Sequence, residues 1–328
     1  MARWYILLLA IVFVVGCKKK PKEEESDEPV SNKPATGHSV TKKGHHGSDD
    51  DDNGGGGGGK SLEGVTSLSL GGSHACAVAE GKLYCWDGAT GTATLKSDAP
   101  GPVQAVANAS CALLEDGSLW CWPHHFQVKG GGRDGAAQIA ASDSDVCASR
   151  QLFVWCWKPD DEAPRAQFDW GGIDRLVVGG GRTCSVVSGG EIECRDVASQ
   201  NGSRPEQISE VQDVSAVAMA WNTMCAVHNK GTVECWNDPK RLVAIDGVAN
   251  ATAIALGSDG EACAVTSGNV TCWKLALAGP SVERPAAPVS GASATTVSVG
   301  AGFACGLGSD RKVRCWTPDG KPQVIAKQ

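Results

Sequence analysis

Cysteine is the reactive residue that recurs along this chain at a regular spacing. Seven times, two cysteines stand with eight or nine residues between them, and six of the seven second cysteines are followed directly by tryptophan. Paired thiols of this kind can form a disulfide or can supply ligands to a metal ion. The pairs are Cys76 with Cys85, Cys111 with Cys121, Cys147 with Cys156, Cys184 with Cys194, Cys225 with Cys235, Cys263 with Cys272, and Cys305 with Cys315.

Spacing separates these two chemistries. A structural zinc site needs four converging ligands, usually from two pairs that are each only a few residues apart. The cysteines of this chain are farther apart within a pair, and each pair stands in its own segment. Disulfides are therefore favoured over a metal site. Fourteen cysteines in disulfides require an oxidising compartment, because cytosolic thiols are kept reduced.

Turn residues predict that each pair spans a β-hairpin. If Cys76 lies opposite Cys85, a two-residue turn Glu80-Gly81 remains between the strands, and the same count leaves Ser267-Gly268 in the sixth pair. The longer spacing leaves three-residue turns that end in glycine, as a type I turn followed by a left-handed residue requires. These glycines are Gly117, Gly190 and Gly231; Gln151-Leu152 and Ser309-Asp310-Arg311 fit the count without glycine. Directly opposed strand positions place the two Cβ atoms within reach of a disulfide.

The elements around the hairpins indicate a repeat protein made of strands. First cysteines recur about every 38 residues, a period typical of units that bury their apolar faces against their neighbours. Short segments rich in β-branched residues and bounded by turn residues precede the cysteines. Alternation then places each cysteine pair and the aliphatic pair next to it on one face, and a small residue and the tryptophan on the other. Arg195 stands where a tryptophan is expected, which predicts a looser or more exposed corner in the fourth unit.

The units resemble the repeats of the regulator of chromosome condensation family. GGSHACAVAEGKLYCW (71–86) is close to that family's consensus, as are CALLEDGSLWCW (111–122) and CAVHNKGTVECW (225–236). The resemblance covers about residues 64–327, although the motif that usually follows the tryptophan in the family is missing. It implies an all-β fold, a seven-bladed β-propeller with four strands per blade, and the cysteine spacing adds one disulfide hairpin to each blade.

The two ends of the repeat region predict how the ring closes. The sixth unit contains LVAID before its inner segment, whereas the first unit begins at EGVTSLSLGG without such a strand. The chain ends with KPQVIAK (321–327), a spare copy of that strand. We expect this C-terminal strand to complete the first blade and so remove an open sheet edge.

The N-terminal residues are typical of a bacterial lipoprotein. Arg3 precedes a 12-residue apolar stretch that ends at Val15, and Val-Val-Gly stands directly before Cys17. The stretch is shorter than the roughly 20 residues a membrane-spanning helix needs. Three lysines after Cys17 favour retention of the tail in the cytoplasm, but the disulfides favour export. We therefore expect residues 1–16 to be a lipoprotein signal peptide and Cys17 to be lipid-attached.

A charged and glycine-rich segment separates this leader from the repeats. Residues 17–60 hold almost no apolar residues to bury, so we expect an unfolded tether and assign the propeller to 61–328. Residues His45, His46 and Asp49–Asp52 supply metal-ligand types, yet a solvated charge run is the simpler interpretation. The expected location is the bacterial cell envelope, at the outer membrane or cell surface.

Charge and motifs exclude several functions. Residues 1–60 hold equal numbers of basic and acidic residues, so the net charge of −7 falls on the propeller and disfavours a nucleic-acid partner. His74 belongs to the repeat, and His228 flanks a turn. No motif for a nucleophilic serine, a zinc protease or a phosphate-binding loop occurs. We expect no enzymatic activity, no cofactor and no metal.

Binding by loops at the propeller rim is the remaining function class. The segments before the first cysteines should share one rim, and a second group of residues lies in longer connections. The candidate binding residues are Trp221, Asp143, Asp145, Asp259 and Glu261 on the rim, and His124, His125, Phe126 and Trp170 in the connections. We expect a monomer that binds another protein without catalysis. Inhibition of a secreted enzyme and binding of an envelope or cell-wall glycan are the alternatives.

Overall fold

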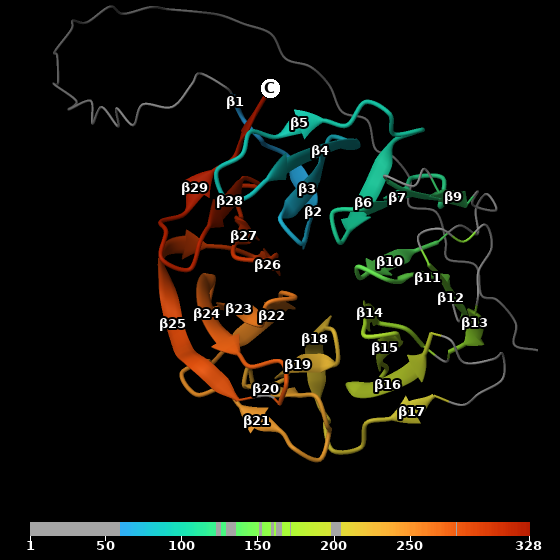
Figure 1. Ribbon diagram of the computed structural model, residues 1–328, viewed down its shortest axis with the longest axis vertical. Helices are drawn as coiled ribbons and strands as arrows, with labels where there is room; N and C mark the ends of the chain where they lie inside the picture. The colour runs from blue at the N-terminus through green and yellow to red at the C-terminus, as the bar shows by residue number, and fades with distance from the viewer. Residues whose placement is uncertain are drawn as a thin grey trace, which may run out of the picture. The chain divides into compact units, whose positions relative to one another are not determined.

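The computed structural model describes residues 60–122, 126–128, 136–150, 153–158, 161, 166–170, 172–197, 205–279 and 281–328, with backbone alone for 126–128 and 166–169. These residues form seven four-stranded antiparallel sheets arranged around an axis (Figure 1). In each sheet the strands follow one another in chain order from the axis outward. No helix among the described residues is long and apolar enough to cross a membrane.

The first four blades are built from consecutive strands. They are β2 (Val65–Gly71), β3 (His74–Ala79), β4 (Lys82–Asp87) and β5 (Thr94–Leu95); β6 (Val103–Ala107), β7 (Cys111–Leu114), β8 (Leu119–Cys121) and β9 (Phe126–Val128); β10 (Gln138–Ala141), β11 (Val146–Arg150), β12 (Phe153–Trp157) and β13 (Ala166–Asp169); β14 (Arg175–Gly179), β15 (Arg182–Val187), β16 (Glu191–Asp196) and β17 (Glu206–Gln207).

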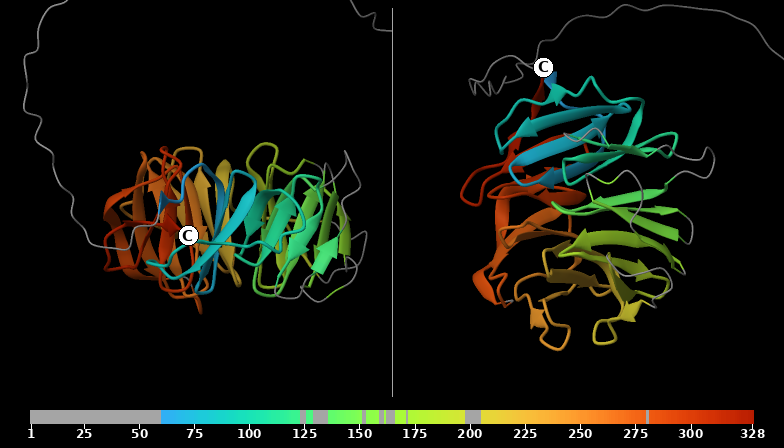
Figure 2. Two further views of the ribbon diagram at one scale, coloured as in Figure 1. Left: turned by 90° about the horizontal axis from the view of Figure 1, so that it is seen from above. Right: turned by 45° about the vertical axis from the view of Figure 1, so that its right-hand side comes forward.

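The last three blades follow the same plan. They are β18 (Val214–Ala220), β19 (Thr223–His228), β20 (Val233–Trp236) and β21 (Val243–Ala244); β22 (Ala251–Leu256), β23 (Glu261–Thr266), β24 (Asn269–Leu275) and β25 (Val282–Ser293); β26 (Thr296–Val299), β27 (Ala304–Leu307), β28 (Val313–Trp316) and β29 (Gln323–Val324). Figure 2 shows these blades from the side and obliquely. The predicted seven-bladed propeller is confirmed.

The cysteine hairpins have the predicted register. Each pair joins the second and third strands of one blade, with S–S distances of 2.02 to 2.12 Å. Glu80 and Gly81 both have positive φ, at 53° and 71°, as a type I′ turn requires. Gly117, Gly190 and Gly231 occupy the predicted left-handed position, and Arg311 adopts it without glycine at φ 58°. The Gln151-Leu152 turn lies outside the described residues.

The cysteines of these hairpins are core residues of the propeller. Cys194 of the fourth blade and Cys315 of the seventh have no exposed surface, and Cys85 alone among the fourteen is only partly buried. The disulfides therefore stabilise the blades from inside. The bridges are Cys76 to Cys85, Cys111 to Cys121, Cys147 to Cys156, Cys184 to Cys194, Cys225 to Cys235, Cys263 to Cys272, and Cys305 to Cys315.

Blades pack through their two unlike faces, as the alternation predicts. The disulfide and aliphatic face of the fifth blade, with Cys225 and Val227, packs on Ala262, Ala264 and Trp273 of the sixth blade. The same combination recurs between the sixth and seventh blades and between the fourth and fifth. Trp273 is fully buried. Burial of a large apolar side chain contributes about 1.5–3 kcal/mol, so each of these contacts stabilises two blades at once.

The prediction for Arg195 is wrong. Its side chain is buried, and its guanidinium lies 5.7 Å from the ring centre of Trp170. Trp170 in turn packs on the disulfide face of the third blade. In other blades this place is filled by the tryptophan that follows the second cysteine, which the fourth blade lacks. A cation can stack favourably on an indole face. The corner of the fourth blade is therefore filled by a tryptophan from the preceding connection.

The prediction that the C-terminal strand completes the first blade is wrong in its details. Residues 65–95 supply all four strands of that blade, and Gln323–Val324 form the outer strand of the seventh. The LVAID segment, which suggested a leading strand, contains β21, the outer strand of the fifth blade. The amide of Ile325 donates to Val313 O as the amide of Ile245 donates to Val233 O. A repeat period sets the spacing of the units without showing where a unit begins.

The last residues close the ring at the junction of the seventh and first blades. β30 (Ala326–Lys327) pairs with β1 (Lys60–Ser61), and the amide of Ala93 in the first blade donates to Ala326 O. Lys60 therefore belongs to the folded part of the chain. Leu62 and Ile325 are buried in one core with side chains of both blades. Residues 56–328 form a compact unit of their own.

Inner strands also hold this junction together. Ser298 Oγ of the seventh blade accepts a hydrogen bond from Leu70 N of the first at 2.9 Å. Ser67 Oγ accepts one from Val106 N at the junction of the first and second blades. The first and last blades thus meet through the same kind of contact as two blades that are consecutive in sequence.

Removal of residues 326–328 tests the closure. We expect the amide of Ala93 to lose roughly tenfold or more of its protection against hydrogen exchange, because its acceptor is deleted. The amide of Ile245, which is bonded within the fifth blade, is the matched control and should keep its protection. Unchanged exchange at Ala93 would show that the ring is closed without this strand.

Candidate functional site

The turns between the first and second strands of all seven blades surround one mouth of the central channel. A cavity of ≈ 620 Å³ opens there, lined by inner strands and by these turns. Sites for small ligands usually measure about 300–1,000 Å³. The prediction that the segments before the first cysteines share one rim is confirmed.

The wall of this cavity combines apolar and polar surface in nearly equal parts. Inner strands contribute Val106, Ile139, Val177, Met219 and Ile254, and the other wall positions are chiefly alanine, valine, glycine and serine. Inner strands converge on the axis, so their axis-facing side chains have no further layer to pack against. Apolar surface therefore stays open to a ligand at this mouth.

Trp221 is the most exposed large apolar residue among those described, at 59%. It lies in the turn of the fifth blade and lines the cavity mouth. Its φ is 50°, a left-handed conformation that costs an L-residue about 1–2 kcal/mol. Gly72 and Gly180 hold the same turn position and conformation in two other blades. A bulky residue in a strained and exposed turn suggests that the indole is retained for binding.

Neighbouring turns pack on one another and fix the position of Trp221. A Cβ built on Gly180 would lie 2.2 Å from Asn222 Oδ1 and 2.7 Å from Trp221 O. A Cβ on Gly71 would lie 2.0 Å from Asn108 O in the next blade. Only glycine permits these approaches, so the rim is a ring of turns in contact.

Asp143 supplies the single ionisable side chain among the described lining residues of the cavity. It lies exposed in the turn of the third blade, and its Oδ1 accepts a hydrogen bond from Asn108 Nδ2 at 3.1 Å. Asn108 comes from the second blade and was not predicted as a site residue. Its φ of 48° is a left-handed turn conformation that asparagine tolerates.

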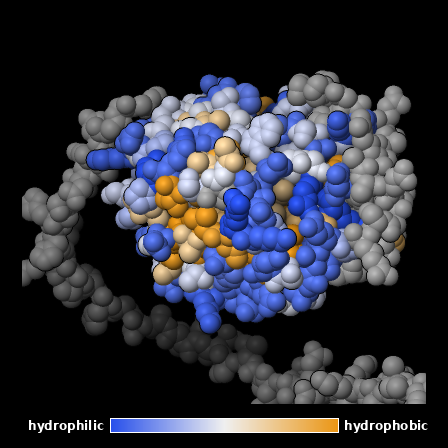
Figure 3. Space-filling model, turned by 60° about the horizontal axis from the view of Figure 1, so that its bottom comes forward, coloured by the Kyte–Doolittle hydropathy of each residue, from blue (hydrophilic) through white to orange (hydrophobic). Residues whose placement is uncertain are grey.

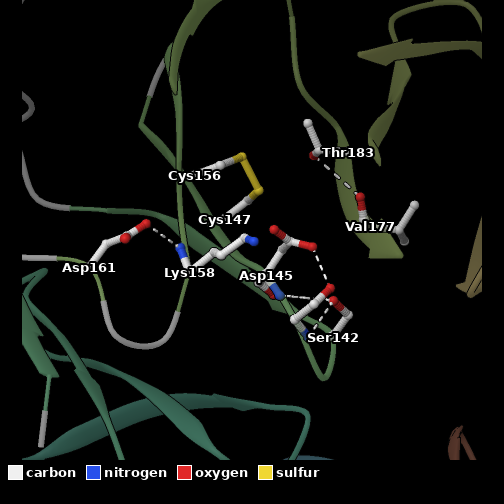
Figure 4. Close-up of a disulfide and its surroundings, with 9 residues drawn as sticks. Ser142, Asp145, Cys147, Cys156, Lys158, Asp161, Val177 and Thr183 are labelled. Carbon is white, nitrogen blue, oxygen red and sulfur yellow. Dashed lines mark hydrogen bonds between the residues drawn. A yellow bond between two sulfur atoms is a disulfide. The ribbon is translucent and has the colours of Figure 1, made fainter. Parts of the chain in front are cut away.

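Three of the predicted binding residues are buried, which corrects their assignment as surface contacts. Trp170 is 1% exposed, and its Nε1 donates to Glu193 Oε2 at 2.7 Å. Asp145 is 4% exposed and accepts a hydrogen bond from Ser144. Figure 4 shows Asp145 between the Cys147–Cys156 disulfide and the Ser142 turn. Contacts inside the propeller occupy these side chains.

Glu261 is the third of them. It is 4% exposed and forms an ion pair with Arg284 on the outer strand β25. Burial raises the pKa of the Glu261 carboxyl above its ordinary value of 4.5, while the Arg284 guanidinium opposes that shift. Cys263 and Cys272 lie beside Glu261, but their sulfurs are joined in a disulfide and do not act as thiolate ligands.

The remaining predicted binding residues differ in their burial and in whether the structure describes them. Asp259 is half-buried, and its two carboxylate oxygens accept hydrogen bonds from Glu261 N and Gly302 N. Phe126 is described only as part of strand β9. His124 and His125 lie outside the described residues. Trp221 and Asp143 are therefore the predicted residues that the structure brings to the channel mouth.

Two histidines have carboxylate partners. His74 Nδ1 lies 2.5 Å from Asp87 Oδ1, and both side chains are well exposed at the edge of a second cavity between the first and second blades. His228 Nε2 lies 3.1 Å from Glu234 Oε2. A histidine–carboxylate pair acts in nucleophilic catalysis when a nucleophile stands within hydrogen-bond reach. No hydroxyl or thiol bonds to either imidazole among the described hydrogen bonds.

Figure 3 shows apolar and polar residues side by side on the part of the surface that it views. The large apolar side chains exposed there and elsewhere outside the channel are Leu95, Phe153, Val282 and Val324. They belong to four different blades and are each less than half exposed. Scattered apolar residues of this kind are ordinary on protein surfaces, so we assign them no binding role.

Comparison with solved structures places the chain among propellers. The CRINKLY WD40 ectodomain of the Arabidopsis thaliana receptor kinase ACR4 is 18% identical with a TM-score of 0.53, covering 81% of this chain and 98% of that one. The WD40 β-propeller domain of Doa1 is 13% identical with a TM-score of 0.55, covering 79% and 94%. A chain from the mitotic checkpoint complex is 13% identical with a TM-score of 0.56, covering 79% and 93%.

These similarities show the fold: the chain is a seven-bladed β-propeller. No protein-family model and no curated protein sequence matches it. The resemblance to regulator of chromosome condensation repeats stays a prediction from the cysteine hairpins.

The burial of Glu261 predicts a pH dependence of stability. A carboxyl whose pKa is raised by folding binds more protons in the folded state, so the folded state loses stability as pH rises above about 4.5 and through the folded pKa. The Glu261→Gln variant does not titrate there. We expect the free energy of unfolding of the wild type to fall relative to this variant over that window, measured by urea unfolding.

The Asp310→Asn variant is the control for this measurement. The side-chain hydrogen bond from Arg314 lowers the pKa of Asp310 to about 2, so its contribution should not change above about pH 5. A difference between wild type and Glu261→Gln that stays constant, or has the opposite slope, would contradict the assignment.

Proposed function

We propose that this chain is an exported, lipid-anchored interaction protein whose propeller binds another protein at the channel mouth. The observation that carries the proposal is Trp221, an exposed tryptophan held in a strained turn beside a cavity with apolar surface in its wall. Tryptophan is enriched among residues that dominate binding energy at protein interfaces. The surrounding turns are in mutual contact, so the indole is presented by a rigid frame and loses little freedom on binding.

The anchor and the location rest on the N-terminal residues and on the disulfides. Cys17 follows an apolar stretch and the Val-Val-Gly triplet, and seven cysteine pairs at disulfide distance suit an oxidising compartment outside the cytoplasm. The intact mass of the mature protein tests this part, because acylated Cys17 should be its first residue. A mature chain that begins at Met1 would contradict it.

Trp221→Gly tests the binding proposal without damaging the fold. Glycine accepts the left-handed turn, so we expect stability to change by less than about 1 kcal/mol in either direction, since relief of strain opposes the added freedom of the unfolded chain. The indole is lost. A partner retained from envelope extract by the immobilised 56–328 fragment should then bind at least tenfold more weakly to the variant, measured by surface plasmon resonance.

The Leu95→Ala variant is the matched control, because Leu95 is an exposed apolar residue outside the channel. We expect this variant to retain the partner with unchanged affinity. Equal binding by wild type and Trp221→Gly would refute the channel mouth as the binding site. Retention on insoluble wall material, blocked by soluble glycan, would favour glycan binding instead.

A further inference from the structure

We propose that the channel mouth recognises the side chain of a lysine or arginine on the partner. This inference rests on the proposed function, because it names the chemistry that the same site would select. Its support comes from three properties of the cavity: the apolar part of its wall, the charge of its lining and the aromatic group at its edge.

The wall suits the stem of a long side chain. Val177, Met219 and Ile254 give the cavity apolar surface, and ≈ 620 Å³ exceeds the volume of one side chain. Lysine and arginine bury their methylene groups along apolar surface while the charged group stays at a polar position. A wholly polar or short side chain would leave this wall in contact with water.

Charge selects a cationic end group. Asp143 is the one ionisable residue in the lining, and no basic side chain lies among the described lining residues. Asn108 Nδ2 holds the carboxylate at the mouth. An anionic ligand would therefore meet repulsion without compensation, whereas an ammonium or guanidinium group would gain an ion pair beside a surface of low polarity.

Trp221 and Asp143 stand on the turns of the fifth and third blades. The fourth blade lies between them, and its turn is Gly179-Gly180-Gly181, which carries no side chain. A cation within about 6 Å of an indole centre gains roughly 0.5–2 kcal/mol. A bound lysine or arginine thus has an aromatic face and a carboxylate at the same mouth, and Asn222 Oδ1 against Gly180 adds a neutral acceptor between them.

A titration with small probes tests this inference. The probes are N-acetyl-lysine-N-methylamide and the norleucine analogue, which has nearly the same stem and no charge. They are added to the 56–328 fragment while indole NH signals are followed by NMR, with the Trp221 signal assigned from Trp221→Gly. We expect the lysine probe to shift this signal with an affinity roughly tenfold higher than that of norleucine, and the preference to weaken as salt is added.

Asp143→Asn should abolish the preference for lysine. Asp259→Asn is the matched control, because Asp259 lies on the same rim with both oxygens bound to backbone amides, and it should keep the preference. Equal binding of the two probes to wild type, or no shift of the Trp221 signal with either, would overturn the inference.

The outcomes also separate this inference from the proposed function. Loss of the partner by Trp221→Gly together with equal binding of the two probes would leave the protein-binding proposal standing and reject the lysine site. Partner binding that is insensitive to Trp221→Gly would reject the proposed function, even if the lysine probe shifts the indole signal.

Discussion

The disulfide that joins the second and third strands of each blade sets the register on which the propeller depends. A slip of one residue in a strand would move its side chains to the opposite face. Fixed register keeps sulfur and aliphatic groups on one face, with small residues and tryptophan on the other. The second face of each blade covers the first face of its neighbour, as Trp273 covers the Cys225–Cys235 side of the fifth blade. Closure at the seventh and first blades repeats this packing around Cys305 and Cys315, with Leu62 and Ile325 added to the buried cluster.

A ring held together in this way can carry strain at its rim. The turns of neighbouring blades approach so closely that Gly71 and Gly180 have no space for a Cβ. Trp221 keeps a left-handed backbone in the same ring, although glycine would fit with less strain. Strain retained at an exposed position on a rigid scaffold is typical of functional residues. The binding proposal and the lysine inference both follow from this position, from Asp143 and from the apolar channel beside them.

Features governed by local spacing could be predicted from the sequence. Cysteine pairing and the turn at Glu80-Gly81 depend on residues close together in the chain. The shared rim of Trp221 and Asp143 follows from the repetition of the same hairpin in every blade. Features that depend on contacts with neighbouring blades or distant residues could not be predicted from the sequence. Trp170 looked exposed because its cover comes from the third and fourth blades, and Glu261 looked accessible because Arg284 lies 23 residues away. The C-terminal strand was misassigned because the repeat period does not show where a blade begins.

Non-reducing peptide mapping of the purified chain tests the central claim most directly, because the register of every blade rests on its own disulfide. Proteolysis under conditions that prevent exchange should yield seven bridges, each between cysteines nine or ten positions apart in one blade, and no free thiol in residues 61–328. An abundant bridge between blades, such as Cys85 to Cys111, would contradict the register and the face-to-face packing that follows from it.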